Sequence, residues 1–238
     1  MDIVNDTSYE PFAEDYLSKS NDNFVLNHYE RPYITSQLPE MNNLTVLDVG
    51  CATGFYSRYC QDRGAKIICV DASQKMVKHT VELCNGKAEG HVHDIAQPMS
   101  FMPSDSANVI ICSLVLHYVE QWEGVLSEFH RILKKGGICV ISTHHPVNDF
   151  TRFNQENYFR TRLIEDEWEN FGKPLRVKYH VRPLSKYIEL MLNSELALTK
   201  VTEPMPSDEL EELHEKFYRR LREHPLFLFF ILEKKTDA

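Results

Sequence analysis

The chain has 238 residues, of which 42% are hydrophobic, and it carries a formal net charge of -9 at pH 7. A chain of this length buries a substantial core as one domain with an elaboration, whereas two unrelated domains would be a tight fit. The negative charge argues against nucleic acid as a partner, because phosphate backbones are bound by clustered Lys and Arg.

Neither a targeting segment nor a membrane span is predicted. The N-terminus, MDIVNDTSYEPFAEDY, lacks a basic stretch followed by an apolar run, and the longest apolar run, LFLFFIL, is too short to cross a bilayer. The six cysteines show no C-x-x-C spacing, and Cys69, Cys112 and Cys139 lie in apolar runs. We therefore expect a cytoplasmic protein with buried thiols, no metal site and no membrane partner.

The first 143 residues fall into two parts. Residues 1–43 indicate one or two short helices, with Phe12 and Tyr16 in the first, that end at Arg31-Pro32. Beyond them, β-branched runs alternate with helical patterns up to Thr143. The predicted strands are residues 44–49, 66–71, 88–93, 107–113 and 137–143. The predicted helices are residues 55–63, 73–84 and 120–134. Ser73 is the expected N-cap of the second helix, and the third carries an apolar stripe of Trp122, Leu126, Phe129 and Leu133. This alternation indicates a parallel sheet covered on both faces.

The pattern changes after Thr143. Residues 144–157 indicate a loop, and residues 158–172 and 173–181 indicate two strands around a turn at Gly172. The second strand has an apolar face, made of Leu175, Val177, Tyr179 and Val181, and a polar face, made of Arg176, Lys178, His180 and Arg182. We expect the side chains of the polar face to be solvated and to pair with the acidic residues of the first strand, Glu165, Asp166, Glu167 and Glu169. This pairing is favoured over a role of the polar face in binding an acidic substrate. Further predictions are a helix at residues 183–193, a strand at 195–204, a helix at 207–223 with Leu210, Leu213, Phe217 and Leu221 inward, and a last strand at 225–235.

The segment TVLDVGCATGFYSRYC joins the first predicted strand to a helix through a glycine turn. Its spacing, Gly50 to Gly54 with Ala52 between, lacks the third glycine of the dinucleotide fingerprint G-x-G-x-x-G. Asp48, two residues before the first glycine, would repel a diphosphate. Asp71 ends the next strand, where a carboxylate can accept hydrogen bonds from both hydroxyls of a ribose. The turn therefore favours a nucleoside that carries a positive group, and S-adenosylmethionine meets both demands.

The same segment resembles the first motif of class I S-adenosylmethionine-dependent methyltransferases, D-x-G-x-G-x-G, with Asp48, Gly50, Ala52 and Gly54 at its four places. The resemblance continues through VDAS, HVHDIAQPMSF, ANVIICSLVLHYVEQW and HRILKKGGICVISTHHP, so it covers about residues 44–146. YERP, LHYVEQW, STHHP and TEPMP also resemble small-molecule methyltransferases of the type 11 group. Ala52 departs from the motif, at a cost of roughly 1 kcal/mol if the backbone there needs a positive φ.

This resemblance implies a doubly wound α/β fold. The sheet is expected to have seven mostly parallel strands, with the last strand antiparallel, and a small two-stranded insert as a substrate cap. Accordingly, residues 1–43 would form a helical cap, 44–143 the core that binds S-adenosylmethionine, 144–182 the cap insert, and 183–238 the return to the core sheet.

The family precedent also implies the cofactor contacts. The methionine part would lie against the loop from Gly50 to Gly54, including Cys51 and Ala52, with Asp48 near its ammonium group. Asp71 would bind the ribose. The remaining expected contacts are Ala72, Met76, Asp94 and Ile95 around the adenine, Ser113, Leu114 and His117 near the methyl-bearing sulfur, and Tyr29, which closes over the cofactor or simply packs.

Methyl transfer is an in-line displacement in which alignment contributes most, so a side-chain base is useful but not obligatory. His117, His144 and His145 follow strand ends and are candidate bases for an oxygen or nitrogen nucleophile, with one of the adjacent pair facing the crevice and the other packing. The expected function is methylation of a small molecule by a monomer or homodimer. Tyr9, Phe12, Tyr16, Phe153, Tyr158 and Trp168 favour a flat or apolar acceptor. The alternatives are a catalytically silent sensor or scaffold that binds S-adenosylmethionine and, less favoured, a nicotinamide oxidoreductase.

Overall fold

The structure is a computed structural model that describes residues 10, 13–19, 23–153, 156–168 and 175–236. The turn predicted at Gly172, the aromatic residues Tyr9 and Phe12, and Glu169 lie outside the described residues, as does the side chain of Trp168.

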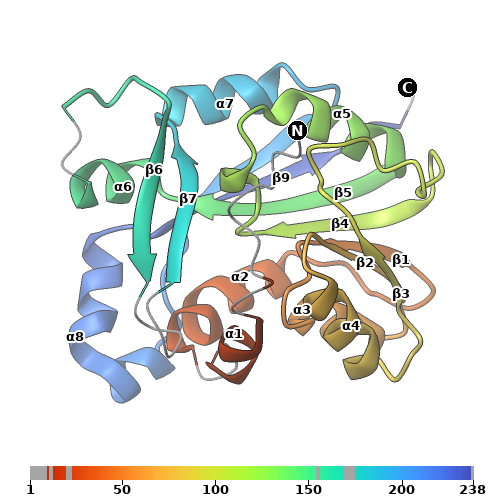
Figure 1. Cartoon of the computed structure of the whole chain (residues 1–238). Helices are drawn as coiled ribbons and strands as arrows, with labels where there is room; N and C mark the ends of the chain where they lie inside the picture. The colour runs from red at the N-terminus through yellow and green to blue at the C-terminus, as the bar shows by residue number, and fades with distance from the viewer. Residues whose placement is uncertain (1–9, 11–12, 20–22, 154–155, 169–174, 237–238) are drawn as a thin grey trace.

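The main sheet has seven strands, in the spatial order β3-β2-β1-β4-β5-β9-β8 (Figure 1). They are β1 (Thr45–Val49), β2 (Lys66–Asp71), β3 (Glu89–Val92), β4 (Ala107–Ser113), β5 (Leu133–His144), β8 (Ala197–Thr202) and β9 (Phe227–Glu233). Strand β9 is antiparallel to both of its neighbours, and the other pairs are parallel. The prediction of a doubly wound sheet with an antiparallel last strand is confirmed. The chain order reverses between β1 and β4, the kind of position at which open α/β sheets bind ligands.

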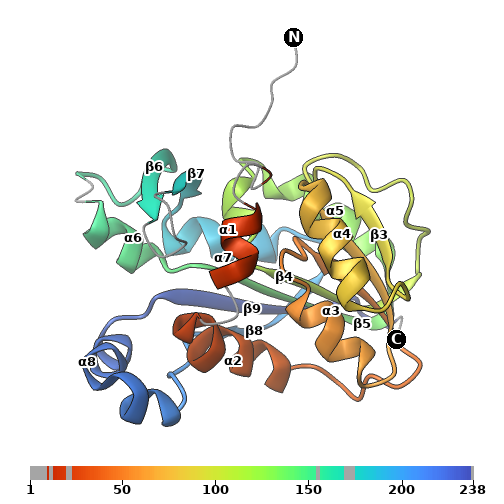
Figure 2. The ribbon, with the colours of Figure 1, turned by 60° about the horizontal axis from the view of Figure 1, so that its bottom comes forward.

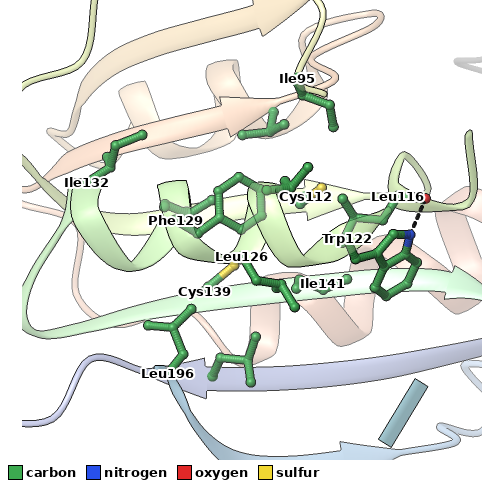
Figure 3. Packing of buried hydrophobic residues seen from close by; sticks show 14 of the residues in the cluster. Ile95, Cys112, Leu116, Trp122, Leu126, Phe129, Ile132, Cys139, Ile141 and Leu196 are labelled. Carbon is green, nitrogen blue, oxygen red and sulfur yellow. Dashed lines mark hydrogen bonds between the residues drawn. The ribbon is translucent and has the colours of Figure 1, made fainter. Parts of the chain in front are cut away.

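Helices cover both faces of this sheet. One face is covered by α2 (Arg31–Ser36), α3 (Phe55–Gln61), α4 (Gln74–Leu83) and α8 (Glu209–Glu223), and the other by α5 (Trp122–Ile132) and α7 (Leu184–Leu192). Three members of the predicted apolar stripe, Trp122, Leu126 and Phe129, lie on α5 and are buried against strand residues such as Cys112 and Ile141 (Figure 3). The fourth, Leu133, is also buried but is the first residue of β5. The indole nitrogen of Trp122 donates to the carbonyl of Leu116 at 2.6 Å, so its one polar atom is satisfied.

Two predictions about helix ends are wrong, and both concern proline. The N-terminal helical segment does not end at Arg31-Pro32, because η3 (Leu26–Glu30), a π-helical turn, leads into α2 with a proline in its first turn. The loop predicted at residues 144–157 contains α6 (Pro146–Arg152), whose N-cap is His145. Proline lacks an N–H and fits the first turn of a helix, so in both places it marks a helix start.

Helix α8 turns a different set of side chains inward from the set expected. Leu213 is 65% exposed, whereas Leu210, Tyr218 and Leu221 are buried. The backbone at His214 has φ -159° and ψ 70°, which interrupts the helix. Because the interruption rotates the second half of the helix relative to the first, one helical period of 3.6 residues does not predict the buried face of both halves.

The insert forms a separate two-stranded antiparallel sheet of β6 (Arg162–Trp168) and β7 (Leu175–Val181). Val177, Tyr179 and Val181 are buried on its inner face, as predicted. Figures 1 and 2 place helix α1 (Ala13–Lys19) between this pair of strands and helices α3 and α4. Glu10, just before α1, accepts a hydrogen bond from Ser73 Oγ at 2.5 Å, which ties the N-terminal segment to the start of α4.

The charged face of the insert serves more than one purpose. Arg176 is exposed and lies 3.9 Å from Glu165 and 3.4 Å from Glu167 across the strand pair, as expected. Arg182 differs from the expectation of a solvated side chain, since it is buried and donates to the carbonyls of Val119 at 2.6 Å and Glu120 at 2.7 Å. It therefore fastens the end of the insert to the main body.

These two arginines are expected to differ in their effect on stability. Arg176→Glu should change the free energy of unfolding by less than about 0.5 kcal/mol, because exposed ion pairs contribute little. Arg182→Met should cost about 2 kcal/mol or more, because it removes the donor that serves two carbonyls. Urea denaturation of both variants checks this, and an equal loss in the two would contradict it.

The cysteines Cys51, Cys60, Cys69, Cys84, Cys112 and Cys139 are free and buried, as predicted. Among the described residues, no helix is both long and apolar enough to cross a membrane. In the same part of the chain, no group of three or more His, Cys, Asp or Glu side chains is arranged to hold a metal ion.

Candidate active site

A cavity of about 1250 Å³ opens at the carboxyl ends of the parallel strands. It is larger than the 300–1,000 Å³ or so of most small-molecule sites, which gives room for two ligands. Its walls come from the segments that follow β1, β2, β3, β4 and β5, from η3 and the start of β9, and from α6, β6 and β7 of the insert.

The loop after β1 alternates between left-handed and ordinary backbone. Gly50, Ala52 and Gly54 have φ of 70°, 44° and 76°. A Cβ at Gly50 would lie 2.1 Å from Val115 Cγ2, so only glycine fits there. Ala52 is held by two hydrogen bonds, from its N–H to Asp71 Oδ2 at 3.0 Å and from Thr80 Oγ1 to its carbonyl at 3.2 Å. These bonds explain how the chain tolerates an alanine in the strained position.

Ala52→Gly is expected to raise the free energy of unfolding by about 0.5 kcal/mol. The left-handed backbone of Ala52 costs the folded state roughly 1 kcal/mol, and a glycine would remove this strain. The gain exceeds the free-energy loss that arises because glycine gives the unfolded chain more conformational entropy. Gly54→Ala is the matched contrast, since its Cβ would lie 2.9 Å from Thr80 Oγ1, and it should destabilise the protein. Thermal denaturation compares the two, and a loss of more than about 1 kcal/mol for Ala52→Gly would contradict the assignment of strain.

Asp71 lies on the cavity wall at the end of β2. Its carboxylate accepts from the N–H groups of Ala52 at 3.0 Å and Ser73 at 2.9 Å. Burial raises the pKa of this carboxyl, and the backbone donors work in the opposite direction. A carboxylate offers about four acceptor positions, so it retains capacity for further hydroxyl donors.

Asp48 lies behind the loop and does not line the cavity. Its Oδ2 accepts from the N–H of Ser57 at 3.0 Å and from Ser57 Oγ at 2.6 Å, at the start of α3. Burial raises the pKa of Asp48 to about 6, although the bonds from Ser57 oppose that shift. In this structure its carboxylate therefore anchors a helix, and its predicted contact with the cofactor ammonium stays a prediction.

Glu30, which the sequence analysis did not select, lines the cavity from the end of η3. Its Oε1 accepts from Ser113 Oγ at 2.6 Å and Ser142 Oγ at 2.9 Å, and its Oε2 accepts from the Tyr56 hydroxyl. Burial raises the pKa of Glu30, and these hydroxyl donors lower it. The signal was present in the YERP motif, of which only the tyrosine was assigned a role.

Arg31 follows Glu30 and also lines the cavity. Its guanidinium lies 4.2 Å from the centre of the Phe55 ring and donates to Asn27 Oδ1 at 2.5 Å. The cavity wall thus carries a carboxylate and a guanidinium side by side next to the glycine loop.

Most of the other predicted cofactor residues lie on the cavity wall. They are Gly50, Cys51, Ala52, Ala72, Met76, Asp94, Ile95, Ser113 and Leu114. Leu114 has φ 54°, a strained value for a residue with a side chain. Asp94 Oδ1 also accepts from the N–H of Ala96 at 3.0 Å, so it stabilises its own turn. Gly54 and Tyr29 do not line the cavity, and Tyr29 is buried with its ring stacked on Phe227.

The three candidate histidines separate into two kinds. His117 and His144 line the cavity, whereas His145 is buried beside it. His145 Nε2 lies 2.6 Å from Glu203 Oε1, and its Nδ1 accepts from the N–H of Val147 at 3.2 Å, so both ring nitrogens are occupied. One histidine of the adjacent pair therefore faces the cavity and the other packs.

The rings of His117 and His144 stack at 4.2 Å between centroids. His117 is 1% exposed, and neither of its ring nitrogens has a hydrogen-bond partner in the described part of the chain. Burial lowers the pKa of His117 well below the usual value and lowers that of His144 to about 4. Both imidazoles are therefore neutral at pH 7, and each offers one donor and one acceptor nitrogen.

Residues 47–141 match a family model described as a methyltransferase domain. A Haemophilus influenzae protein described as uncharacterized is 26% identical over 225 residues, 86% of this chain and 87% of that one. The thiol S-methyltransferase TMT1B of Rattus norvegicus is 27% identical over 135 residues, 55% of this chain and 53% of that enzyme. The structure of a candidate S-adenosylmethionine dependent methyltransferase from Listeria monocytogenes aligns with a TM-score of 0.76 and 23% identity, over 87% of this chain and 97% of that one.

The domain match and the sheet together define the class of protein. Residues 47–141 are a methyltransferase domain of the type 11 family, and the sheet has the fold of class I S-adenosylmethionine-dependent methyltransferases. The resemblance drawn from the sequence motifs is thereby confirmed.

Proposed function

We propose that this enzyme transfers the methyl group of S-adenosylmethionine to an oxygen or nitrogen atom of a small, ring-bearing molecule. The observation that carries the proposal is one continuous cavity, whose wall includes Asp71 as well as His117 and His144. When bound, the cofactor supplies an electrophilic methyl carbon on its sulfonium. The contribution of the chain is then to hold cofactor and acceptor in line and to exclude water.

The residues at one end of the cavity fit the cofactor. Asp71 has acceptor capacity for the two ribose hydroxyls, and Ala72 and Met76 lie beside it on the wall for the adenine. We assign the ammonium to Glu30 and the carboxylate of the methionine part to Arg31, because both residues line the cavity next to the glycine loop. Asp48 would act behind them by fixing the start of α3.

The other end of the cavity fits a flat acceptor. Its wall includes His117, Tyr118, His144, Tyr179 and Phe227, whose rings contact one another at centroid distances of 4.2 to 6.1 Å. Aromatic faces and neutral imidazoles bind planar molecules and offer hydrogen bonds to an O–H or N–H group.

The expected role of the other aromatic residues is supported only in part. Tyr16 lines the cavity. Phe153 packs against the insert, and the Tyr158 hydroxyl accepts from the N–H of Leu184 at 2.9 Å, so these two contribute to structure instead.

Two measurements test the proposal. Calorimetry with S-adenosylhomocysteine should give micromolar binding, and no binding would end it. Transfer of a labelled methyl group should then be measured over a panel of phenols, amines and thiols. Label in the phenols or amines supports an oxygen or nitrogen acceptor. Label in thiols alone would instead agree with the name of the rat relative, a thiol S-methyltransferase. Binding of the cofactor product without any methyl transfer would favour a silent sensor or scaffold.

A further inference from the structure

A carboxylate lies behind the wall of the acceptor end. Asp149, on α6, is 1% exposed, and its Oδ1 lies 3.8 Å from His144 Nδ1. His144 lines the cavity and Asp149 does not, so the imidazole stands between the carboxylate and the space for the acceptor.

Asp149 is otherwise poorly satisfied. Within the described part of the chain, neither carboxylate oxygen accepts a hydrogen bond of good geometry, and the polar groups beside it are His144 and the Asn148 amide. Burial of a carboxylate without donors is unfavourable, so the fold keeps this group at a cost. The imidazole of His144 is the donor that a small rotation would bring into hydrogen-bond distance.

We propose that Asp149 and His144 form one proton-accepting pair, in which Asp149 accepts a hydrogen bond from His144 Nδ1, so that the lone pair of the imidazole lies on Nε2 and takes the proton of the methyl acceptor. This inference rests on the proposed transfer to oxygen or nitrogen. His144 is the residue that touches the acceptor, and Asp149 is a positioning residue that acts through it.

The surroundings agree with this division of roles. The groups that face the pair are His117 from the 3-10 turn η4 (Leu116–Tyr118), Tyr179 from β7, Asp166 from β6, Tyr187 from α7, and Arg152 on α6 itself. Arg152 donates to Asp166 at 2.8 Å, so their charges largely cancel. Burial raises the pKa of Asp149 to about 7 while it lowers that of His144 to about 4. The carboxyl of Asp149 is thus the group of this pair whose pKa lies near neutral pH, where a general base works best.

The reaction balances with this pair alone. The oxygen or nitrogen of the acceptor forms a bond to the methyl carbon as the carbon–sulfur bond breaks and its electrons stay on sulfur. The acceptor proton passes to His144 Nε2, and the proton on Nδ1 passes to the Asp149 carboxylate. The acceptor class that needs this arrangement is a hydroxyl or amine that keeps its proton at neutral pH, rather than an acceptor that is already ionised.

The first test reads the tautomer of His144 in the wild-type protein. Nitrogen chemical shifts at pH 8, with and without S-adenosylhomocysteine, should show the proton on Nδ1. A proton on Nε2 in both states would overturn the proposal. This readout needs no acceptor and no turnover, and calorimetric binding of S-adenosylhomocysteine tests the proposed function separately.

The second test follows the carbon-bound proton of the His144 ring across pH. Wild-type protein should show a transition between about pH 6 and 8, because the signal senses proton uptake by the pair. Asp149→Asn should lose that transition or move it by more than one pH unit, and Asp105→Asn, at an exposed carboxylate paired with Lys234, should leave it unchanged. The same transition in wild type and Asp149→Asn would overturn the proposal. If Asp149→Asn does not fold, the tautomer in the wild type decides alone.

Discussion

Replacing Asp71 with Ala is expected to weaken the binding of S-adenosylhomocysteine at least about 100-fold, which corresponds to roughly 3 kcal/mol. Two hydrogen bonds from ribose hydroxyls to a charged acceptor account for that amount. The same carboxylate also orders the loop, because it accepts from the N–H groups of Ala52 and Ser73.

Isothermal calorimetry measures this effect, and two further variants locate its origin. Asp71→Asn keeps the shape and one acceptor oxygen but loses the charge, so its binding should be intermediate. Asp62→Ala, which removes an exposed partner of Arg58, should bind as the wild type does. A dissociation constant within fivefold of the wild-type value for Asp71→Ala would contradict the assignment of the ribose site.

Asp48→Asn is expected to stabilise the protein above pH 6. In the unfolded chain an aspartate has a pKa near 3.9, whereas burial raises that of Asp48 in the folded protein to about 6. Folding therefore disfavours the ionised form. The cost of burying the ionised carboxylate is absent below about pH 4, grows as pH rises, and is complete above pH 6. The difference of about two pKa units between the folded and unfolded states corresponds to a loss of at most about 3 kcal/mol in the free energy of unfolding.

The amide oxygen of an asparagine can still accept from Ser57, so the variant avoids the penalty and keeps the helix anchor. Urea denaturation at pH 4, 6 and 7.5 should show no difference between wild type and variant at the lowest pH and the largest gain at the highest. Asp62→Asn serves as the exposed control. A variant less stable than the wild type at pH 7.5 would mean that charge-dependent bonds to Asp48 outweigh its burial.

Much of the fold could be predicted because local and global preferences agree. The strands around Leu47, Ile68 and Ile110 are continuous apolar runs, and only a sheet buried on both faces uses such runs. Ser73 caps α4 as predicted, by accepting from the N–H of Met76 at 3.2 Å. Where a single residue changes the local rule, as His214 does in α8, periodicity alone gives the wrong inward face.

The site could be predicted where it consists of chain neighbours. The glycine loop and Asp71 follow strand ends, so their meeting at one edge is a property of parallel sheets. Glu30 and Asp149 come from helices outside the alternating region, and only tertiary contacts bring Glu30 to the cavity and Asp149 to a place behind His144. Arg182 illustrates the same limit, because nothing in the alternation of β7 indicates that its guanidinium reaches the carbonyls of Val119 and Glu120.

The contacts of Glu30 have a consequence for the order in which the protein assembles during synthesis. Glu30 leaves the ribosome 83 residues before Ser113 and 112 residues before Ser142, the hydroxyls that its carboxylate joins. Contacts so distant in sequence form late, since the loop between them must first be closed. The N-terminal segment is thus made long before its partners, and the hydroxyl donors around Glu30 are complete only after β5 has joined the sheet.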